Sequence, residues 1–405
     1  MKILFITAEG FDTPNPNNQM AEVMINNFLD RGYQVHLIQS HRKGINPDIP
    51  KSIEGRYGFT HDTIVRTVVD KSNFVKRYFN DLKYHFDSYK RWKKVNDADI
   101  IYLQSNPTIY VPIWLIKRRF KNTPIVYSIY DVFPGHAYDI GVIKNKTLYN
   151  VFKWLQKPCY RKVSAITVLS EDMKDIVVRE GANADDVYVV PAWYDVKTTS
   201  ERPKSENRFI QKYNISTDKF VCQYAGSLGY VFNYKTILEL ATRLKEKDKD
   251  ILVEVIGDGP IKDIFVKEAK DRGLDNIEFY PLQPVELVPD VYSACDCEVI
   301  PLKRGVIGNG TPSKAPILMA CKRLIVNSVE AWSKYSKSFK EHNMGLAVDV
   351  EDYDGLANAV CWAKNHPENV NVMKENALAY VRDNFSSTKS LNTLSEVLEK
   401  YYRES

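Results

Sequence analysis

Residues 1–40 read MKILFITAEGFDTPNPNNQMAEVMINNFLDRGYQVHLIQS, and this stretch decides the fold. Residues 2–8 and 33–39 are short runs rich in Ile, Leu and Val, which is typical of strands buried on both faces. Between them, apolar residues recur at helical spacing and Gly32 is a helix-stop signal. A strand, a helix and a second strand in this order predict a parallel sheet with helices on both faces.

The same alternation continues along the chain and then restarts. Further buried strands are predicted at residues 99–104, 124–130 and 165–170, and again at residues 220–225, 251–256, 277–280, 297–302 and 324–327. Residues 197–218 are polar and contain a proline, so we expect a linker there. Because 405 residues are too many for one ordinary core, the sequence predicts two doubly wound α/β domains, residues 1–196 and 219–385, with a ligand-binding cleft between them.

Composition and charge exclude several classes of protein. Apolar residues make up 44% and charged residues 26%, which is typical of a soluble globular chain. No apolar run approaches the roughly 18–20 residues of a membrane-spanning helix, and the opening residues do not resemble a signal peptide. The six cysteines lack the spacing of a zinc site, so we expect buried, reduced thiols in a cytoplasmic protein. Residues 1–200 carry 28 Lys and Arg against 21 Asp and Glu, which indicates an anionic partner for this half.

A glycine-rich segment, GVIGNGTPSK at residues 305–314, separates a predicted strand from a predicted helix. Two glycines would allow a tight turn, a hydroxyl could cap the helix and a proline suits its first turn; these residues are Gly308, Gly310, Thr311, Ser313 and Pro312. Together with Lys303, Arg304 and Lys314, such a helix start is typical of a site for a pair of phosphates. The alternative is a plain loop in which glycine serves only the backbone. The order GxxxxGK[ST] of a Walker P-loop is absent.

Two more glycine-rich turns follow predicted strands, YAGSLG at residues 224–229 and GDGP at residues 257–260. Parallel strands end on one edge of a sheet, so Gly226, Gly229 and Asp258 are expected near the first segment. Glycine at a strand end lets a ligand approach the backbone, and Asp258 could accept a hydrogen bond from a ribose or a base.

In the first half, Asp131 and His136 follow the strand predicted at residues 124–130 and should also lie at the cleft. A carboxylate and an imidazole there could perform acid–base chemistry or hold a sugar hydroxyl. The alternative is a turn in which Asp131 caps the next element.

A basic, aromatic-rich helix is predicted at residues 71–95, where eight Lys and Arg face two Asp. Val75, Phe79, Leu82, Phe86 and Tyr89 form one apolar stripe at helical spacing. Such a helix can lie on an anionic membrane surface, or it can bury the stripe in its own domain. The residues expected to face the membrane are Lys76, Arg77, Lys83, Lys90, Arg91 and Trp92. Residues 114–121 (WLIKRRFK) are a second patch of this kind, and no nucleic-acid-binding module is recognisable.

The chain resembles the family 4 glycosyltransferases, retaining enzymes of the GT-B fold, and especially the bacterial branch that builds capsule, exopolysaccharide and O-antigen. The resemblance covers nearly the whole chain through the order and spacing of several motifs. These are YDVFP at 130–134, the strand at 165–170 followed by EDM, VPAW at 190–193 with Asp195, YAG at 224–226 with Gly229, IGDGP at 256–260, and PLK at 301–303 leading to PSK at 312–314.

The resemblance implies two Rossmann-like domains facing across a cleft, with residues 386–405 packing back on the first domain. The second domain would hold the diphosphate of a nucleotide sugar, with a UDP-sugar favoured, without a metal. Its donor-binding residues would be Gly226, Gly229, Asp258, Lys303, Gly310, Pro312 and Ser313. Asp131, His136 and Lys314 would be catalytic. The acceptor would be an undecaprenyl-diphosphate-linked sugar or a growing glycan, at the cytoplasmic face of an anionic inner membrane.

The sequence departs from the family at several positions. The family's paired glutamates would fall at Asn309 and Ile317, and its basic pair after the first strand of this domain near Ser227 and Asn233. These departures leave open a non-catalytic GT-B subunit that anchors or activates a partner enzyme. A nucleotide-sugar epimerase would need more acidic and His residues in the cleft. A dinucleotide-dependent dehydrogenase is disfavoured, because no GxGxxG follows the first strand.

Overall fold

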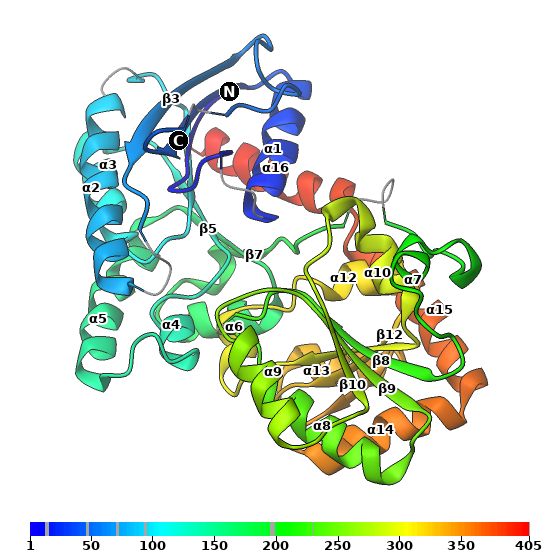
Figure 1. The fold of residues 1–405 in the computed structure, drawn as a ribbon. Coiled ribbons are helices and arrows are strands. Elements are labelled where there is room, and N and C mark those ends of the chain that lie inside the picture. Colours follow the sequence, from blue (N-terminus) through cyan, green and yellow to red (C-terminus); the bar gives the residue numbers. More distant parts are fainter. Residues whose placement is uncertain are drawn as a thin grey trace. The chain divides into compact units, whose positions relative to one another are not determined.

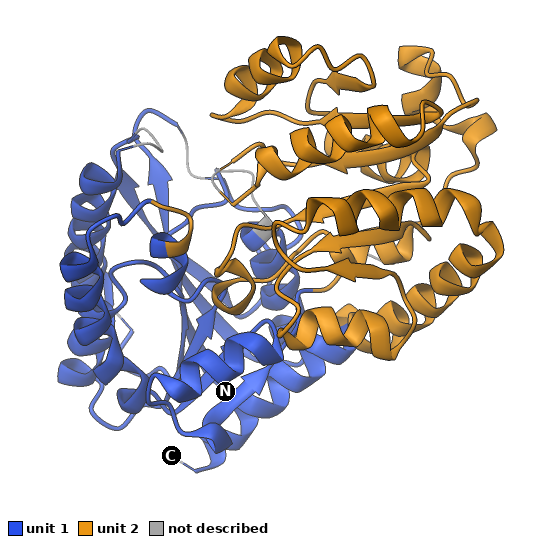
Figure 2. Ribbon diagram, turned by 90° about the horizontal axis from the view of Figure 1, so that it is seen from below, with its two compact units in different colours: residues 1–138, 142–192, 388–405 blue, residues 139–141, 193–387 orange. Residues whose placement is uncertain are grey.

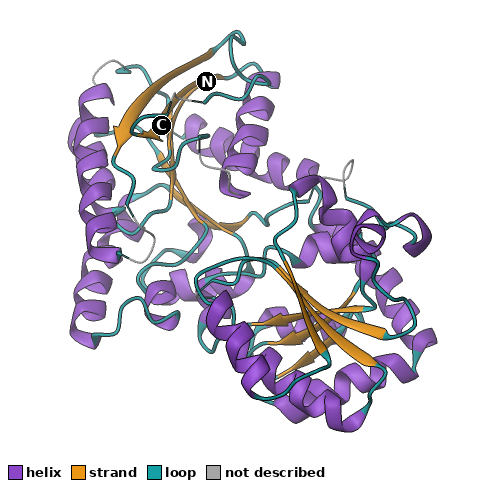
Figure 3. Cartoon of the chain, viewed as in Figure 1, coloured by secondary structure: helices purple, strands orange, loops and turns teal. Residues whose placement is uncertain are grey.

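The computed structural model describes residues 1–12, 16–45, 48–69, 73–92, 95–194, 199–229 and 231–404. The chain divides into two compact units, which Figure 2 shows in different colours. Unit 1 contains residues 1–138, 142–192 and 388–405, and unit 2 contains residues 139–141 and 193–387. Each unit is a parallel sheet surrounded by helices, which confirms the predicted α/β class (Figure 3).

Unit 1 is built on a sheet whose seven described strands run in the order β3-β2-β1-β4-β5-β6-β7 (Figure 1). The strands are β1 (Lys2–Ile6), β2 (Gln34–Arg42), β3 (Phe59–Arg66), β4 (Ile100–Gln104), β5 (Ile125–Ile129), β6 (Ala165–Val168) and β7 (Val187–Val189). The helices are α1 (Pro16–Asp30), α2 (Phe74–Trp92), α3 (Tyr110–Arg119), α4 (Gly135–Asp139), α5 (Lys146–Lys162), α6 (Glu171–Arg179), η1 (Ala184–Asp186) and α16 (Ser387–Arg403).

The central strands of unit 1 are buried on both faces because helices cover both faces of the sheet. Leu4 and Ile6 of β1 pack in one cluster with Trp92 of α2. Phe5, which points to the other face, packs against Tyr102 with tilted rings whose centroids are 4.8 Å apart. Helices α2, α3 and α5 lie on one face of the sheet, and α1 lies with α16 on the other (Figure 1).

The last described helix, α16, completes unit 1. Tyr401 donates a hydrogen bond to Asp186 at 2.6 Å, and Ser390 donates one to the carbonyl oxygen of Pro191 at 3.0 Å. Near the start of the chain, the hydroxyl of Tyr33 donates to Glu399. The preceding helix, α15 (Pro367–Asn384), belongs to unit 2.

Unit 2 is built on a second parallel sheet, whose six described strands run in the order β10-β9-β8-β11-β12-β13. The strands are β8 (Phe220–Ala225), β9 (Ile251–Ile256), β10 (Ile277–Tyr280), β11 (Cys297–Pro301), β12 (Leu324–Ser328) and β13 (Leu346–Val348). The helices besides α15 are η2 (Lys204–Glu206), α7 (Arg208–Tyr213), α8 (Tyr234–Lys247), α9 (Lys262–Asp271), η3 (Val285–Leu287), α10 (Val288–Ala294), α11 (Val306–Asn309), α12 (Ala315–Ala320), α13 (Lys334–Glu341) and α14 (Tyr353–Asn365). The six cysteines are free thiols; Cys361 is half-buried and the rest are buried.

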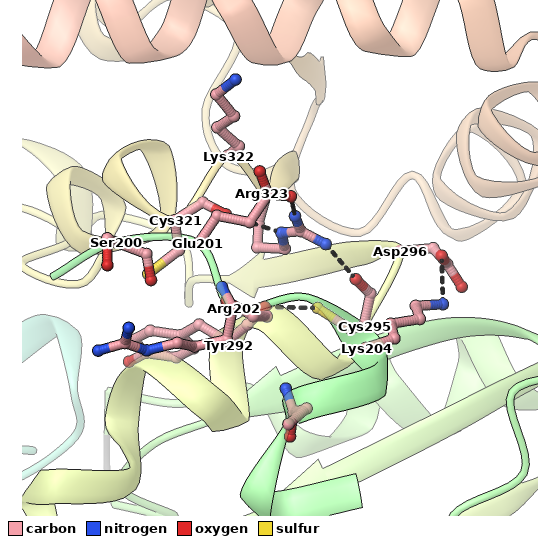
Figure 4. A network of polar contacts seen from close by, with 12 residues as sticks. Ser200, Glu201, Arg202, Lys204, Tyr292, Cys295, Asp296, Cys321, Lys322 and Arg323 are labelled. Atoms are coloured by element: carbon pink, nitrogen blue, oxygen red, sulfur yellow. Dashed lines mark hydrogen bonds and ion pairs between the residues drawn. The ribbon is translucent and has the colours of Figure 1, made fainter.

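The segment expected to be a linker is, where the structure describes it, part of unit 2. Residues 195–198 lie outside the described residues, and residues 199–218 contain η2 and α7. Lys204 pairs with Asp296 at 2.9 Å, and the buried Arg323 binds Glu201 and the carbonyl oxygen of Cys295 (Figure 4). Phe209 of α7 is fully buried in the core. The polar composition suggested a linker because the charged side chains of this segment lie at the surface and pair with residues distant in the sequence, and composition does not reveal that pairing.

A row of buried polar side chains crosses the sheet of unit 2. Gln223 of β8 is in register with Glu254 of β9 on one side and with Glu298 of β11 on the other. The amide of Gln223 donates to Glu254 at 3.3 Å, and Glu254 is fully buried. Burial raises the pKa of the Glu254 carboxyl from 4.5 to about 7.

The buried carboxyl of Glu254 predicts a pH-dependent stability. Because the folded protein holds the proton of this carboxyl more tightly than the unfolded chain does, the carboxyl contributes its full stability below about pH 4.5. This part of the free energy of unfolding is lost as the pH rises from about 4.5 through about 7. Glu254→Gln should therefore gain stability relative to the natural chain between pH 5 and 8, by roughly 3 kcal/mol at most. Melting temperatures of both proteins across this range test the expectation. A difference that does not change with pH would contradict it.

Candidate functional site

The carboxyl ends of β8 and β9 form the best-defined part of the site. The loop at residues 226–229 lies against the loop at residues 257–260, and their backbones are bonded together. The amide of Gly226 donates to Ile256 O at 2.9 Å, and the amide of Leu228 donates to Asp258 O at 2.9 Å. Both loops therefore have their conformation fixed by backbone contacts, independently of any bound molecule.

Glycine is required where these two loops touch. A methyl group at Gly257 would lie 2.0 Å from the carbonyl oxygen of Gly226, and one at Gly259 would lie 2.4 Å from that of Leu228. Gly226 and Gly259 also have φ values of +153° and +155°, which favour glycine. Gly229 has more freedom, since the atom nearest to an added methyl group would be the Ser227 hydroxyl at 3.2 Å.

Asp258 lies at the tip of the second loop with 66% of its side chain exposed. Its carboxylate accepts a hydrogen bond from the amide of Gly259 at 2.9 Å, and Lys262 approaches it to 3.8 Å. The side chain is therefore oriented by its own loop and still open to solvent. Its predicted contact with a nucleoside stays a prediction.

The segment at residues 305–314 folds differently from the expectation. The tight turn is made by Gly305, whose φ is +89°, whereas Gly310 is extended. Residues 306–309 form the short helix α11. The next helix, α12, begins after Lys314 with no side-chain cap, and Pro316 lies in its first turn. The predicted caps at Thr311 or Ser313 and the predicted first-turn role of Pro312 are therefore wrong, because the helix starts later than the glycine pattern suggested.

Lys314 reaches inward from the start of α12 to the end of β8. Its ammonium nitrogen lies 2.7 Å from Glu298, 3.4 Å from the carbonyl oxygen of Ala225 and 3.9 Å from the centre of the Tyr224 ring. Burial lowers the pKa of Lys314, and Glu298 opposes that shift. The sequence identified Lys314 but not its partner, although a lone Glu within the apolar strand β11 is a visible signal.

The other basic residues of this segment differ in their surroundings. Lys303 is half-buried, and burial lowers its pKa. Arg304 donates to the carbonyl oxygen of Val350 at 2.9 Å and pairs with Glu351, so it is held by the loop that follows β13.

Glu330, which sequence analysis missed, lies in the turn after β12. Its side chain is buried and accepts a hydrogen bond from the amide of Gly305, so it holds the turn that precedes α11. Its second carboxylate oxygen has no hydrogen-bond partner among the residues the structure describes. Glu330 is thus a carboxylate beside a segment whose positions 309 and 317 are neutral. The only sequence signal was a single acidic residue after a predicted strand.

In unit 1, Asp131 and His136 follow β5, as predicted, and their side chains lie close to each other. The two side chains approach to 3.7 Å, with His136 mostly buried and 59% of Asp131 exposed. The exposed carboxylate can accept a proton or a hydrogen bond from a hydroxyl group of a bound molecule. The neighbouring imidazole can orient the carboxylate.

Comparisons with known proteins identify the family. The model described as "Glycosyltransferase Family 4" matches residues 19–198, and that described as "Glycosyl transferases group 1" matches residues 205–379. The chain belongs to glycosyltransferase family 4. It is 24% identical over 294 residues to the putative colanic acid biosynthesis glycosyl transferase WcaI of Escherichia coli K12, covering 71% of this chain and 70% of WcaI.

Solved structures of glycosyltransferases share the fold. The sucrose-phosphate synthase of Thermosynechococcus elongatus superposes with a TM-score of 0.78 over 100% of both chains at 14% identity. Anabaena HepE in complex with UDP superposes with a TM-score of 0.71 over 99% of this chain and 100% of HepE at 16% identity. These likenesses support the GT-B architecture of this family 4 member.

Helix α2 of this glycosyltransferase exposes five of the six side chains that were predicted to face a membrane. Lys76, Arg77, Lys83, Lys90 and Arg91 of α2 are exposed. Trp92 is fully buried in the core of unit 1, so the prediction that it faces a membrane is wrong. It lies on the face of α2 that packs on the sheet, opposite the exposed stripe. Lys71, Lys93 and Lys94 lie outside the described residues.

An apolar surface accompanies these charges. Val75, Phe79 and Phe86 of α2 are exposed, Phe79 by 64%. Trp114 of α3 is also exposed, and so is Trp154 of α5, by 73%. Helix α3 contacts both α2 and α5, so these side chains belong to neighbouring helices on one face of unit 1. In the described residues, no helix is long and apolar enough to cross a membrane, and no cluster of three or more His, Cys, Asp or Glu could hold a metal ion.

The contact between the two glycine loops predicts the effect of one methyl group. Gly257→Ala should destabilise the protein by about 1–3 kcal/mol, because the new methyl group overlaps the carbonyl oxygen of Gly226. It should also speed hydrogen exchange at the amides of Gly226 and Leu228. Gly229→Ala, in the first of these loops, is the control and should change stability by less than about 0.5 kcal/mol. Equal stability of the two variants would show that the contact is not a constraint.

Proposed function

We propose that this chain transfers a sugar from a nucleotide-diphosphate donor, with a UDP-sugar favoured, to a lipid-linked or growing glycan in bacterial surface polysaccharide synthesis. The observation that carries the proposal is the pair of interlocked glycine loops at the carboxyl ends of β8 and β9. Family membership supports the reaction class. The name of WcaI, which refers to colanic acid biosynthesis, supports the polysaccharide setting, and the HepE complex supports UDP.

On this proposal the donor diphosphate lies against Gly226 and Gly229, where no side chain keeps it from the backbone. Lys314 supplies the positive charge that stabilises the diphosphate as it leaves, so no divalent metal is required. Lys303, Gly310, Pro312 and Ser313 line the same edge, and Asp258 contacts the nucleoside.

The sugar is transferred with retention on this proposal. The acceptor hydroxyl attacks on the face from which the diphosphate departs, and a donor phosphate oxygen takes its proton. No protein nucleophile is needed. Asp131 and His136 orient the transferred sugar through its hydroxyl groups.

A second candidate function is a non-catalytic GT-B subunit that anchors or activates a partner glycosyltransferase. The observation that favours it is the absence of acidic side chains at Asn309 and Ile317, in a segment where the family carries two glutamates. Such a subunit would bind a nucleotide weakly or not at all, and would gain activity only with its partner.

Calorimetry with UDP and a panel of nucleotide sugars, with and without magnesium, separates these functions. We expect metal-independent binding of one nucleoside diphosphate and slow hydrolysis or transfer from the matching sugar nucleotide by the purified chain. Lys314→Ala should raise the activation free energy of transfer from the donor by about 2–4 kcal/mol, because the stabilisation of the departing diphosphate is lost. The double variant Lys314→Ala/Glu298→Gln avoids an unpaired buried carboxylate and should lose the same activity. No binding by the natural chain would favour the non-catalytic subunit.

The exposed apolar and basic side chains of α2, α3 and α5 support a peripheral position on the cytoplasmic face of the anionic inner membrane. Aromatic rings can enter the interface while Lys and Arg attract anionic headgroups. On this proposal the membrane-facing residues include Lys76, Arg77, Lys83, Lys90 and Arg91. Trp114 and Trp154 take the place that the sequence assigned to Trp92.

Vesicle binding tests this surface. Reversing Lys76, Lys83 and Lys90 to Glu should weaken binding to vesicles containing phosphatidylglycerol roughly a hundredfold at low salt, since each basic residue near the surface contributes about 1 kcal/mol. The matched control reverses Lys247, Lys249 and Lys270 of unit 2, which are also exposed. Co-sedimentation measures both, with melting temperatures to establish folding. Equal loss in the two triple variants would mean that net charge matters and this face does not.

A further inference from the structure

Lys314 and Glu298 form an ion pair directly beneath the glycine loop that follows β8. One carboxylate oxygen of Glu298 accepts from both Lys314, at 2.7 Å, and the amide of Ala225, at 2.9 Å. Glu298 is fully buried, whereas 18% of the Lys314 side chain is exposed. The lysine can therefore reach solvent at the loop, and the carboxylate cannot.

An ion pair of this kind offers little attraction to an anion, because the two charges cancel at a distance greater than their separation. For Lys314 to stabilise a diphosphate strongly, its ammonium must exchange Glu298 for the phosphate oxygens. A buried carboxylate left without its cation is costly and takes up a proton instead. The second oxygen of Glu298, which has no hydrogen-bond partner among the described residues, is free to hold that proton.

Further groups with titratable side chains surround Glu298 besides Lys314. They are Tyr224 of β8, Tyr292 of α10, Cys295 directly after α10, and Cys297 at the start of β11. Burial raises the pKa of Tyr224, Tyr292 and Cys295, and a hydrogen bond with Cys222 together with burial raises that of Cys297, so all four are neutral near pH 7. Among these groups, Lys314 is therefore the cation that compensates the negative charge of Glu298. Burial raises the pKa of the Glu298 carboxyl, whereas Lys314 lowers it.

We infer that Glu298 is an internal counter-ion that Lys314 exchanges for the diphosphate of the nucleotide, with uptake of one proton from solvent by Glu298. When the nucleoside diphosphate leaves, Lys314 returns to Glu298 and the proton returns to solvent. Glu298 is in this sense a positioning residue that favours product release. The inference rests on the proposed function, since it requires a nucleoside diphosphate at this loop.

The test measures UDP binding by calorimetry at pH 7.5 and 8.5, in two buffers that differ in ionisation enthalpy. The natural chain should take up close to one proton for each UDP bound and should bind more weakly at the higher pH. Glu298→Gln keeps an oxygen for the Ala225 amide and is permanently neutral. It should bind UDP roughly tenfold more tightly at pH 8.5, without proton uptake, and turnover should fall as product release slows.

Two further variants isolate the exchange. Glu254→Gln removes the other buried carboxyl of the polar row, which does not contact Lys314, and should bind UDP as the natural chain does. In the double variant Glu298→Gln/Lys314→Ala the tighter binding should disappear, because the freed ammonium is its source. Weaker or unchanged binding by a folded Glu298→Gln, or no proton uptake by the natural chain, would overturn the inference while leaving the proposed function intact. Failure of the natural chain to bind any nucleoside diphosphate would overturn both.

Discussion

The backbone contact between the loops after β8 and β9 is the constraint on which the candidate site depends. Two amides, those of Gly226 and Leu228, bond to the neighbouring loop, and the approach leaves no room for a Cβ at Gly257 or Gly259. Because a Cβ is excluded at these two positions, the two loops meet through their backbones rather than through side chains. Lys314 is held by Glu298 of strand β11 and not by a side chain of either loop.

Much of the fold could be predicted because the central strands are continuous apolar runs. The ten strands predicted from such runs are all present; three have the predicted bounds at both ends, and the ends of the others shift by at most three residues. Three strands were missed for physical reasons. β3 is an edge strand whose residues are mostly polar and partly exposed, and β7 and β13 have only three residues each. The helix α7 was hidden because its neighbours are charged, and their partners lie far away in the sequence.

The candidate site was predictable where it rests on glycine and unpredictable where it rests on pairing. Strand ends followed by glycine gave the loops at residues 226–229 and 257–260. The partners of Lys314 and of the Gly305 amide are Glu298 and Glu330, which are 16 and 25 residues away and look like isolated acids in apolar surroundings. Trp92 was wrongly predicted to be exposed and is buried. Helix α2 has aromatic residues on several faces, and its sequence does not reveal which face packs on the sheet.

Helix α16 follows unit 2 in the chain and yet completes unit 1, through contacts with residues as early as Asn27. A ribosome releases the chain from its N-terminus, so every residue of unit 2 is available before the part that finishes unit 1. The unit that begins first is therefore finished last. During synthesis the surface that α16 covers stays open while the second sheet forms, and this open surface is where we would look for the action of a chaperone.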